Sequence, residues 1–137
     1  MADEPLRCSC LCGGVRFEVT EPFERVSMCH CESCKKLSGG YGTVSGRART
    51  DAIRILEGEG LLRSFQPEEG TSKTFCSVCG SNLFGGGWPQ FEFASVRLAT
   101  IDSGFDGKPD RHIYTRSVAD WESLPDDGLP RYETRAP

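Results

Sequence analysis

The chain has 137 residues, eight cysteines and a formal net charge of −4. This acidic balance argues against a general binder of nucleic acids or anionic membranes, because such proteins carry a basic face. No window approaches the roughly 18 apolar residues of a membrane span, and the first five residues lack the basic start and apolar run of a secretory signal. We therefore expect a single domain over residues 1–137 that works in the cytoplasm.

Alternating apolar and polar residues predict several short strands. Val15–Val19 and Ile53–Ile55 alternate with period two, which is typical of half-buried strands. Phe91–Phe93 begins a third alternation, whose phase slips before Val96–Leu98, so we expect a bulge or two short strands there. A further short strand is expected around His112, with Ile113 and Thr115 facing away from His112 and Tyr114.

Helical signals are few. Glu32 to Leu37 can form one or two turns, ended by Ser38-Gly39-Gly40. The tail from Pro125 reads as an extended segment. With 16 glycines and 8 prolines at turns and a hydrophobic fraction of only 37%, the chain is predicted to be mainly β. We expect several small, mostly antiparallel sheets, few short helices, and a metal that supports the small core.

The eight cysteines are clustered in the sequence. They stand at positions 8, 10 and 12, at 29, 31 and 34, and at 76 and 79. The thiol pool of the cytosol keeps cysteines reduced, and disulfide scaffolds usually spread their cysteines to connect distant loops. Tight clusters therefore favour several sulfurs that converge on one ion.

The first and last clusters predict a closed site. Cys76-Ser77-Val78-Cys79-Gly80 has the pattern of a zinc knuckle, in which glycine tolerates the positive φ of the turn. Cys10-Leu11-Cys12-Gly13 is a shorter clasp of the same kind. Two pairs of thiolates make a tetrahedral site typical of structural zinc, although four thiolates can also bind iron. Cys8 is either a bystander or an alternative ligand to Cys10.

The middle cluster predicts a different site. Cys29-His30-Cys31-Glu32-Ser33-Cys34 offers three thiolates and no obvious fourth ligand nearby. Three protein ligands with one open position are the arrangement of catalytic zinc. The cysteines therefore predict two zinc ions, one structural and one catalytic.

Five residues outside the cysteine set are candidates for supporting roles. His30 is expected to point away from the metal, either as a hydrogen-bonded bystander or as a contact to a ligand or substrate. His112 is either a strand-surface histidine or a group that approaches the open position. Lys35, Lys36 and the more distant Arg111 are candidates to contact an anionic substrate. The alternative for the two lysines is that they lie on a helix face that is exposed to solvent.

The chain resembles the glutathione-dependent formaldehyde-activating enzyme family, which includes centromere protein V. The resemblance rests on four stretches: Cys10–Phe17, Cys29–Lys36, Phe75–Phe84, and the segment from His112 through Trp121 to Tyr132. It implies a fold like that of the Mss4 group, built of several coiled antiparallel sheets. It also implies two zinc ions, one held by Cys10, Cys12, Cys76 and Cys79, the other by Cys29, Cys31 and Cys34.

The resemblance further implies carbon–sulfur chemistry on a small thiol such as glutathione, which adds to formaldehyde to form S-hydroxymethylglutathione. An open site with three thiolates can hold the substrate thiol and lower its pKa, or polarise the aldehyde oxygen; we favour the first, because three thiolates blunt the acidity of the metal. The alternative function is a non-catalytic, zinc-stabilised module that binds a protein partner. A methionine sulfoxide reductase of related fold would need a reactive cysteine late in the chain, and none follows Cys79.

Overall fold

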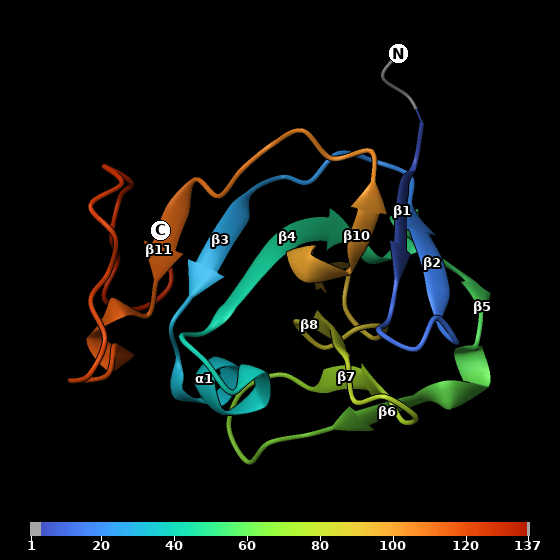
Figure 1. Cartoon of the computed structure of the whole chain (residues 1–137), viewed down its shortest axis with the longest axis horizontal. Coiled ribbons are helices and arrows are strands. Elements are labelled where there is room, and N and C mark those ends of the chain that lie inside the picture. The colour runs from blue at the N-terminus through green and yellow to red at the C-terminus, as the bar shows by residue number, and fades with distance from the viewer. Residues whose placement is uncertain (1–3, 137) are drawn as a thin grey trace. The chain divides into compact units, whose positions relative to one another are not determined.

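The computed structural model describes residues 4–136 and is mainly β, as the sequence predicts (Figure 1). The strands are β1 (Leu6–Ser9), β2 (Arg16–Val19), β3 (Val26–Cys29), β4 (Thr43–Arg49), β5 (Ile53–Glu57), β6 (Leu62–Phe65), β7 (Lys73–Cys76), β8 (Asn82–Gly85), β9 (Phe93–Arg97), β10 (Ile101–Ser103) and β11 (Arg111–Ile113). The α-helix is α1 (Glu32–Ser38), and short 3₁₀ turns are η1 (Thr50–Ala52), η2 (Glu59–Leu61), η3 (Leu98–Thr100) and η4 (Thr115–Ser117). None of the helices in residues 4–136 is long and apolar enough to cross a membrane.

The described residues form two compact units. The first unit comprises residues 4–24 and 46–107, and the second comprises 25–45 and 108–136. Strand β4 begins in the second unit and ends in the first. The prediction of one domain over residues 1–137 stays a prediction.

The first unit is built from antiparallel strands. Strands β10, β1, β2 and β5 are neighbours in that order, as are β9, β8, β7 and β6. On β2, Phe17 and Val19 are buried, which confirms the predicted alternation. Buried residues of this kind make the core of the unit: Cys8, Cys10, Val15, Phe17, Val19, Ala48, Ile53, Cys76, Leu83, Phe84, Ala94 and Val96.

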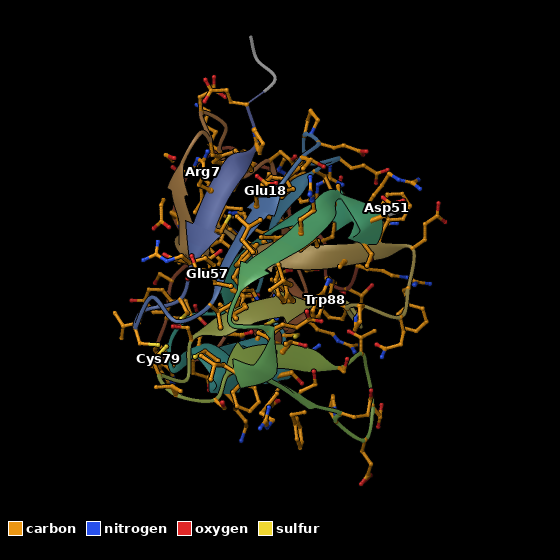
Figure 2. All side chains as sticks on the ribbon, turned by 90° about the vertical axis from the view of Figure 1, so that its right-hand side faces the viewer. Arg7, Glu18, Asp51, Glu57, Cys79 and Trp88 are labelled. Carbon is orange, nitrogen blue, oxygen red and sulfur yellow. The ribbon has the colours of Figure 1, made fainter. Side chains whose placement is uncertain are left out.

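The alternate residues of these strands are charged and lie opposite residues of opposite charge. Arg7 of β1 pairs in register with Glu18 of β2, and Glu18 pairs with Arg54 of β5. Glu57 lies opposite Arg16. Figure 2 shows Arg7, Glu18 and Glu57 along these strands. The period of two therefore divides β2 into a core face and a charged face.

The phase slip predicted before Val96 lies within a single strand, β9, in which Ala94 and Val96 are buried, and not between two short strands. Phe91 is 58% exposed and precedes β9, which begins at Phe93. Because Phe91 lies in a bend before the strand begins, its alternation with Phe93 does not reflect a strand. The predicted start at Phe91 is wrong.

The second unit holds the parallel pair of β3 and β11. Their register places Met28 opposite His112 and Cys29 opposite Ile113. The strand expected around His112 ends at Ile113, because Tyr114 adopts a left-handed φ of 58°. Thr115 therefore lies in η4, contrary to the prediction that it continues the strand. Parallel pairing has no signature in a three-residue strand, so the sequence could not predict it.

The C-terminal tail borders β11. The N–H of His112 donates to the carbonyl of Pro130 (2.9 Å), and the N–H of Tyr132 donates to the carbonyl of His112 (3.0 Å). Further along, the N–H of Tyr114 donates to the carbonyl of Thr134 (2.9 Å). The tail is thus tied to the strand that carries His112.

Candidate metal centres

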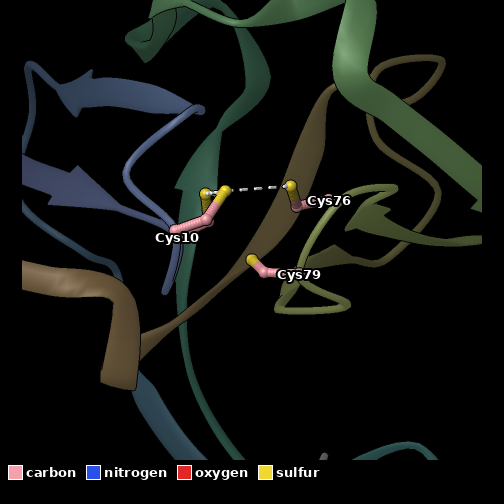
Figure 3. A group of neighbouring side chains, drawn as sticks. Cys10, Cys76 and Cys79 are labelled. Atoms are coloured by element: carbon pink, nitrogen blue, oxygen red, sulfur yellow. Dashed lines mark hydrogen bonds between the residues drawn. The ribbon is translucent and has the colours of Figure 1, made fainter.

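Four cysteines of the first unit meet at one point. The Sγ atoms of Cys10, Cys12, Cys76 and Cys79 all lie within 4.8 Å of one another, and Figure 3 shows those of Cys10, Cys76 and Cys79 converging. The Sγ of Cys12 lies 3.6 Å from that of Cys10 and 3.9 Å from that of Cys76. Tetrahedral zinc with Zn–S bonds of about 2.3 Å separates its sulfurs by about 3.8 Å. The donor set therefore fits a four-coordinate zinc ion.

Tight turns aim these sulfurs. Gly13 and Gly80, which follow the two clasps, have φ of 78° and 80°, as the sequence predicts. The N–H groups of Gly14 and Val15 donate to the Sγ atoms of Cys12 (3.4 Å) and Cys10 (3.2 Å). Such donors favour the ionised thiolates that bind metal.

The second clasp is polarised in the same way. The hydroxyl of Ser81 lies 3.2 Å from the Sγ of Cys79. This contact, together with the N–H of Ser81, lowers the pKa of Cys79 to about 5. Ser81 also accepts a hydrogen bond from the N–H of Leu11 (2.9 Å), which links the two clasps.

Three cysteines of the second unit form the other group. The Sγ atoms of Cys29, Cys31 and Cys34 lie within 4.8 Å of one another. Cys29 is the last residue of β3, and Cys31 is the N-cap of α1. The Sγ of Cys31 accepts a hydrogen bond from the N–H of Cys34 (3.4 Å). The helix ends at Ser38 and is capped by Gly39, whose φ of 70° agrees with the predicted Gly stop.

The chemistry of this group calls for a cation. The pKa of Cys29 is raised, first by its contacts with Cys31 and Cys34 and then by burial. Three sulfurs this close cannot all ionise without a positive charge between them. The hydroxyl of Thr43 also donates to the Sγ of Cys34 (3.1 Å) and supports a thiolate there.

The two groups differ in the number of donors. Among residues 4–136, no fourth histidine, cysteine or carboxylate donor lies within 4.8 Å of all three sulfurs of the second group. The structure therefore brings together each of the two predicted ligand sets within its own unit. Both groups can hold a metal ion and are compatible with zinc.

The two histidines of the second unit form a buried chain. The Nε2 of His30 lies 2.9 Å from the Nδ1 of His112, and the Nε2 of His112 donates to the Oδ2 of Asp127 (2.8 Å). The Nδ1 of His30 lies 3.4 Å from the carbonyl of Tyr41. The expectation that His30 is hydrogen-bonded therefore holds for its side chain.

The interpretation of His112 as a strand-surface histidine is wrong. Its side chain is fully buried, because β3 and the C-terminal tail border β11 on either side. Both of its ring nitrogens are occupied by His30 and Asp127. Sequence reasoning missed Asp127, since it stands in an irregular tail far from the cysteines in sequence.

The remaining candidates have different surroundings. Cys8 lies in the core, where burial raises its pKa to about 12, and it belongs to neither sulfur group. The Nζ of Lys35 donates to the carbonyl of Ser117, whereas Lys36 is exposed. Arg111 pairs with the carboxylate of Asp110 (2.6 Å).

Comparison with known proteins identifies the family. The glutathione-dependent formaldehyde-activating enzyme family matches residues 5–117. A protein of Halomonas elongata named "Putative glutathione-dependent formaldehyde-activating enzyme" is 34% identical over 133 residues, covering 87% of this chain and 80% of that protein. A crystal structure of a Rhodobacter sphaeroides protein has the same fold, with a TM-score of 0.58, 19% identity, and coverage of 93% of this chain and 99% of that one. The chain therefore belongs to the family of glutathione-dependent formaldehyde-activating enzymes, as its cysteine motifs predict.

Proposed function

We propose that the protein is a zinc-dependent carbon–sulfur lyase or synthase that acts on a small thiol adduct, such as S-hydroxymethylglutathione. Family membership supports the glutathione and formaldehyde chemistry. The observation that carries the proposal is the three-sulfur group of Cys29, Cys31 and Cys34, to which residues 4–136 add no fourth donor. A site of this kind can accept a sulfur from outside the protein.

The two cysteine groups take different parts. Cys10, Cys12, Cys76 and Cys79 would hold a structural zinc ion that joins two segments of the first unit. Cys29, Cys31 and Cys34 would hold the catalytic ion. When bound there, zinc supplies positive charge that lowers the pKa of a thiol and favours the nucleophilic thiolate at neutral pH.

The residues around the second group support its three protein sulfurs, while the reacting sulfur belongs to the substrate. In the synthesis direction, the glutathione sulfur loses its proton and forms a bond to the aldehyde carbon. The carbonyl π bond breaks, and the former carbonyl oxygen takes up a proton to become the hydroxyl of the adduct. The Thr43 hydroxyl and the N–H of Cys34 stabilise the protein's own thiolates. The protein sulfurs thus remain ligands while the substrate sulfur reacts.

Glutathione is an anion, so its binding calls for positive side chains. We propose Lys35 and Lys36, at the end of α1, as its contacts. Lys36 is exposed and available to a carboxylate, whereas Lys35 holds the carbonyl of Ser117. His112, being fully buried, would act on the substrate through its neighbours.

We also propose one functional domain over residues 1–137 that works in the cytoplasm. None of the eight cysteines, all within residues 4–136, forms a disulfide, which fits a reducing compartment. The family match runs through both compact units, which supports a single domain.

The test is the rate at which glutathione and ¹³C-formaldehyde form the S–CH₂–OH adduct, followed by NMR against the uncatalysed rate. We expect acceleration by the wild type and by Cys8→Ser, whose sulfur lies outside both groups. Cys34→Ser should return the rate to the uncatalysed value. A wild-type rate equal to the uncatalysed one would favour the non-catalytic binding module.

A further inference from the structure

We propose that Asp127 is a positioning residue for the three-sulfur group, acting through His112 and His30. This inference rests on the proposed function, because it assigns a role toward the second metal ion. It adds a residue from outside the family match, which ends at residue 117. The C-terminal tail would thereby take part in organising the centre.

The contacts form a continuous path within the second unit. The Oδ2 of Asp127 accepts from the Nε2 of His112 at 2.8 Å, and the Nδ1 of His112 lies 2.9 Å from the Nε2 of His30. His30 and His112 are 5% and 0% exposed, so the contact between the two rings is shielded from water, whereas the side chain of Asp127 is 26% exposed. The ring centroids lie 5.1 Å apart and the ring planes are inclined by 21°, so the two rings meet edge to edge through this nitrogen contact. Each ring therefore restricts the orientation of the next.

The path ends between two sulfur ligands. His30 is flanked by Cys29 and Cys31, and its N–H donates to the carbonyl of Ile113 (3.0 Å). Its backbone is thus fixed on one side by β11, while its side chain is fixed by His112. Residue 30 is therefore held at two points, its N–H and its ring, which restrains the backbone that carries both neighbouring sulfurs.

Asp127 is itself firmly placed. Its Oδ1 accepts from the N–H of Leu129 (3.0 Å), while the backbone around His112 is tied to Pro130 and Tyr132. These contacts, the one from His112 first, lower the pKa of Asp127. A carboxylate that only accepts hydrogen bonds fixes the proton of His112 on Nε2. The tail therefore supplies both the anchor and the charge.

The test measures zinc release to a chromogenic chelator, with Asp127→Ala compared with Asp126→Ala. Asp126 is the neighbouring aspartate and is exposed like Asp127, whose carboxylate contacts His112, so it is a matched control. Outer-shell partners typically change metal affinity about 10–100-fold. Because His30 is not itself a ligand, we expect release of one ion to become about tenfold faster in D127A. The other ion should leave at the wild-type rate, as should both ions of D126A.

Two further measurements separate positioning from general stability. The Asn side chain in D127N keeps one acceptor oxygen, so its release rate should lie between those of D126A and D127A. The imidazole N–H resonance of His112, protected from exchange in the wild type, should persist in D127N and vanish in D127A. If D127A does not fold, D127N alone is compared with D126A.

The outcomes are distinct. Two ions in the wild type with equal release rates in D127A, D127N and D126A would overturn the role of Asp127 and leave the proposed function intact. A wild type that binds only one ion would instead overturn the proposed function. Faster release of one ion in D127A, with recovery in D127N, would support the inference.

Discussion

The two cysteine groups are made of the same donor and are built in opposite ways. In the first unit, four sulfurs come from two segments, 10–12 and 76–79, that are distant in the sequence. In the second unit, three sulfurs come from six consecutive residues, and their support comes from other segments. The comparison teaches that a metal which joins distant segments contributes to folding, whereas a local group with three donors is suited to chemistry.

The largest expected effect is the loss of the four-sulfur group. Cys76→Ser should leave the chain unfolded or aggregated, because a structural zinc site contributes about 10–16 kcal/mol and a whole domain is stable by about 5–15 kcal/mol. Circular dichroism and thermal melting check this. Cys8→Ser, which alters a buried cysteine outside both groups, should retain a cooperative melt. A native melt of C76S would contradict the structural role.

The second prediction concerns the three-sulfur group. Cys34→Ser should lose one zinc ion and the adduct-forming activity while keeping the fold of the first unit, whose sulfurs it does not touch. Metal analysis together with circular dichroism measures both effects. Two ions retained by C34S, or complete unfolding, would remove the contrast between the groups.

A third change tests the support of a single sulfur. Thr43→Val removes the hydroxyl that donates to Cys34. A hydrogen bond to a charged group contributes about 1.5–3 kcal/mol, so affinity for the second ion should fall by about tenfold or more. Zinc competition titration gives this affinity. Thr43→Ser keeps the hydroxyl and should stay near the wild type; equal affinities of T43V and T43S would sink the idea.

The smallest effect is expected at the proposed substrate contact. Lys36→Ala should raise the KM for the glutathione adduct by up to about fivefold, because exposed ionic contacts contribute at most about 1 kcal/mol. The kcat should not change. Lys108→Ala, another exposed lysine of the second unit, is the matched control. The same KM for K36A and K108A would exclude Lys36 as a contact.

The sequence predicts the local features of this molecule well. The alternation of Val15–Val19, the helix that begins after Cys31 and the stop at Gly39 depend on neighbouring residues, and all three are found. Both sulfur groups were also predictable, because cysteine spacing directly reflects the geometry of a clasp. The exposed Phe91 misled, since it lies in a bend while Phe93, two residues later, begins β9.

What the sequence could not supply are contacts between distant segments. The burial of His112 depends on β3 and on the C-terminal tail, which border β11. The hydrophobic pattern around residue 112 does not indicate either neighbour. Asp127 carries no motif, and only the path of the tail brings it to His112. The local clusters were therefore predictable, and the hydrogen-bonded support behind them was not.

The most direct measurement is native mass spectrometry of the wild-type protein with and without glutathione. We predict two zinc ions in each molecule, and one glutathione bound only by molecules that carry both ions. A single ion, or glutathione bound equally well after the second ion has been removed, would contradict the claim that the three-sulfur centre receives the substrate.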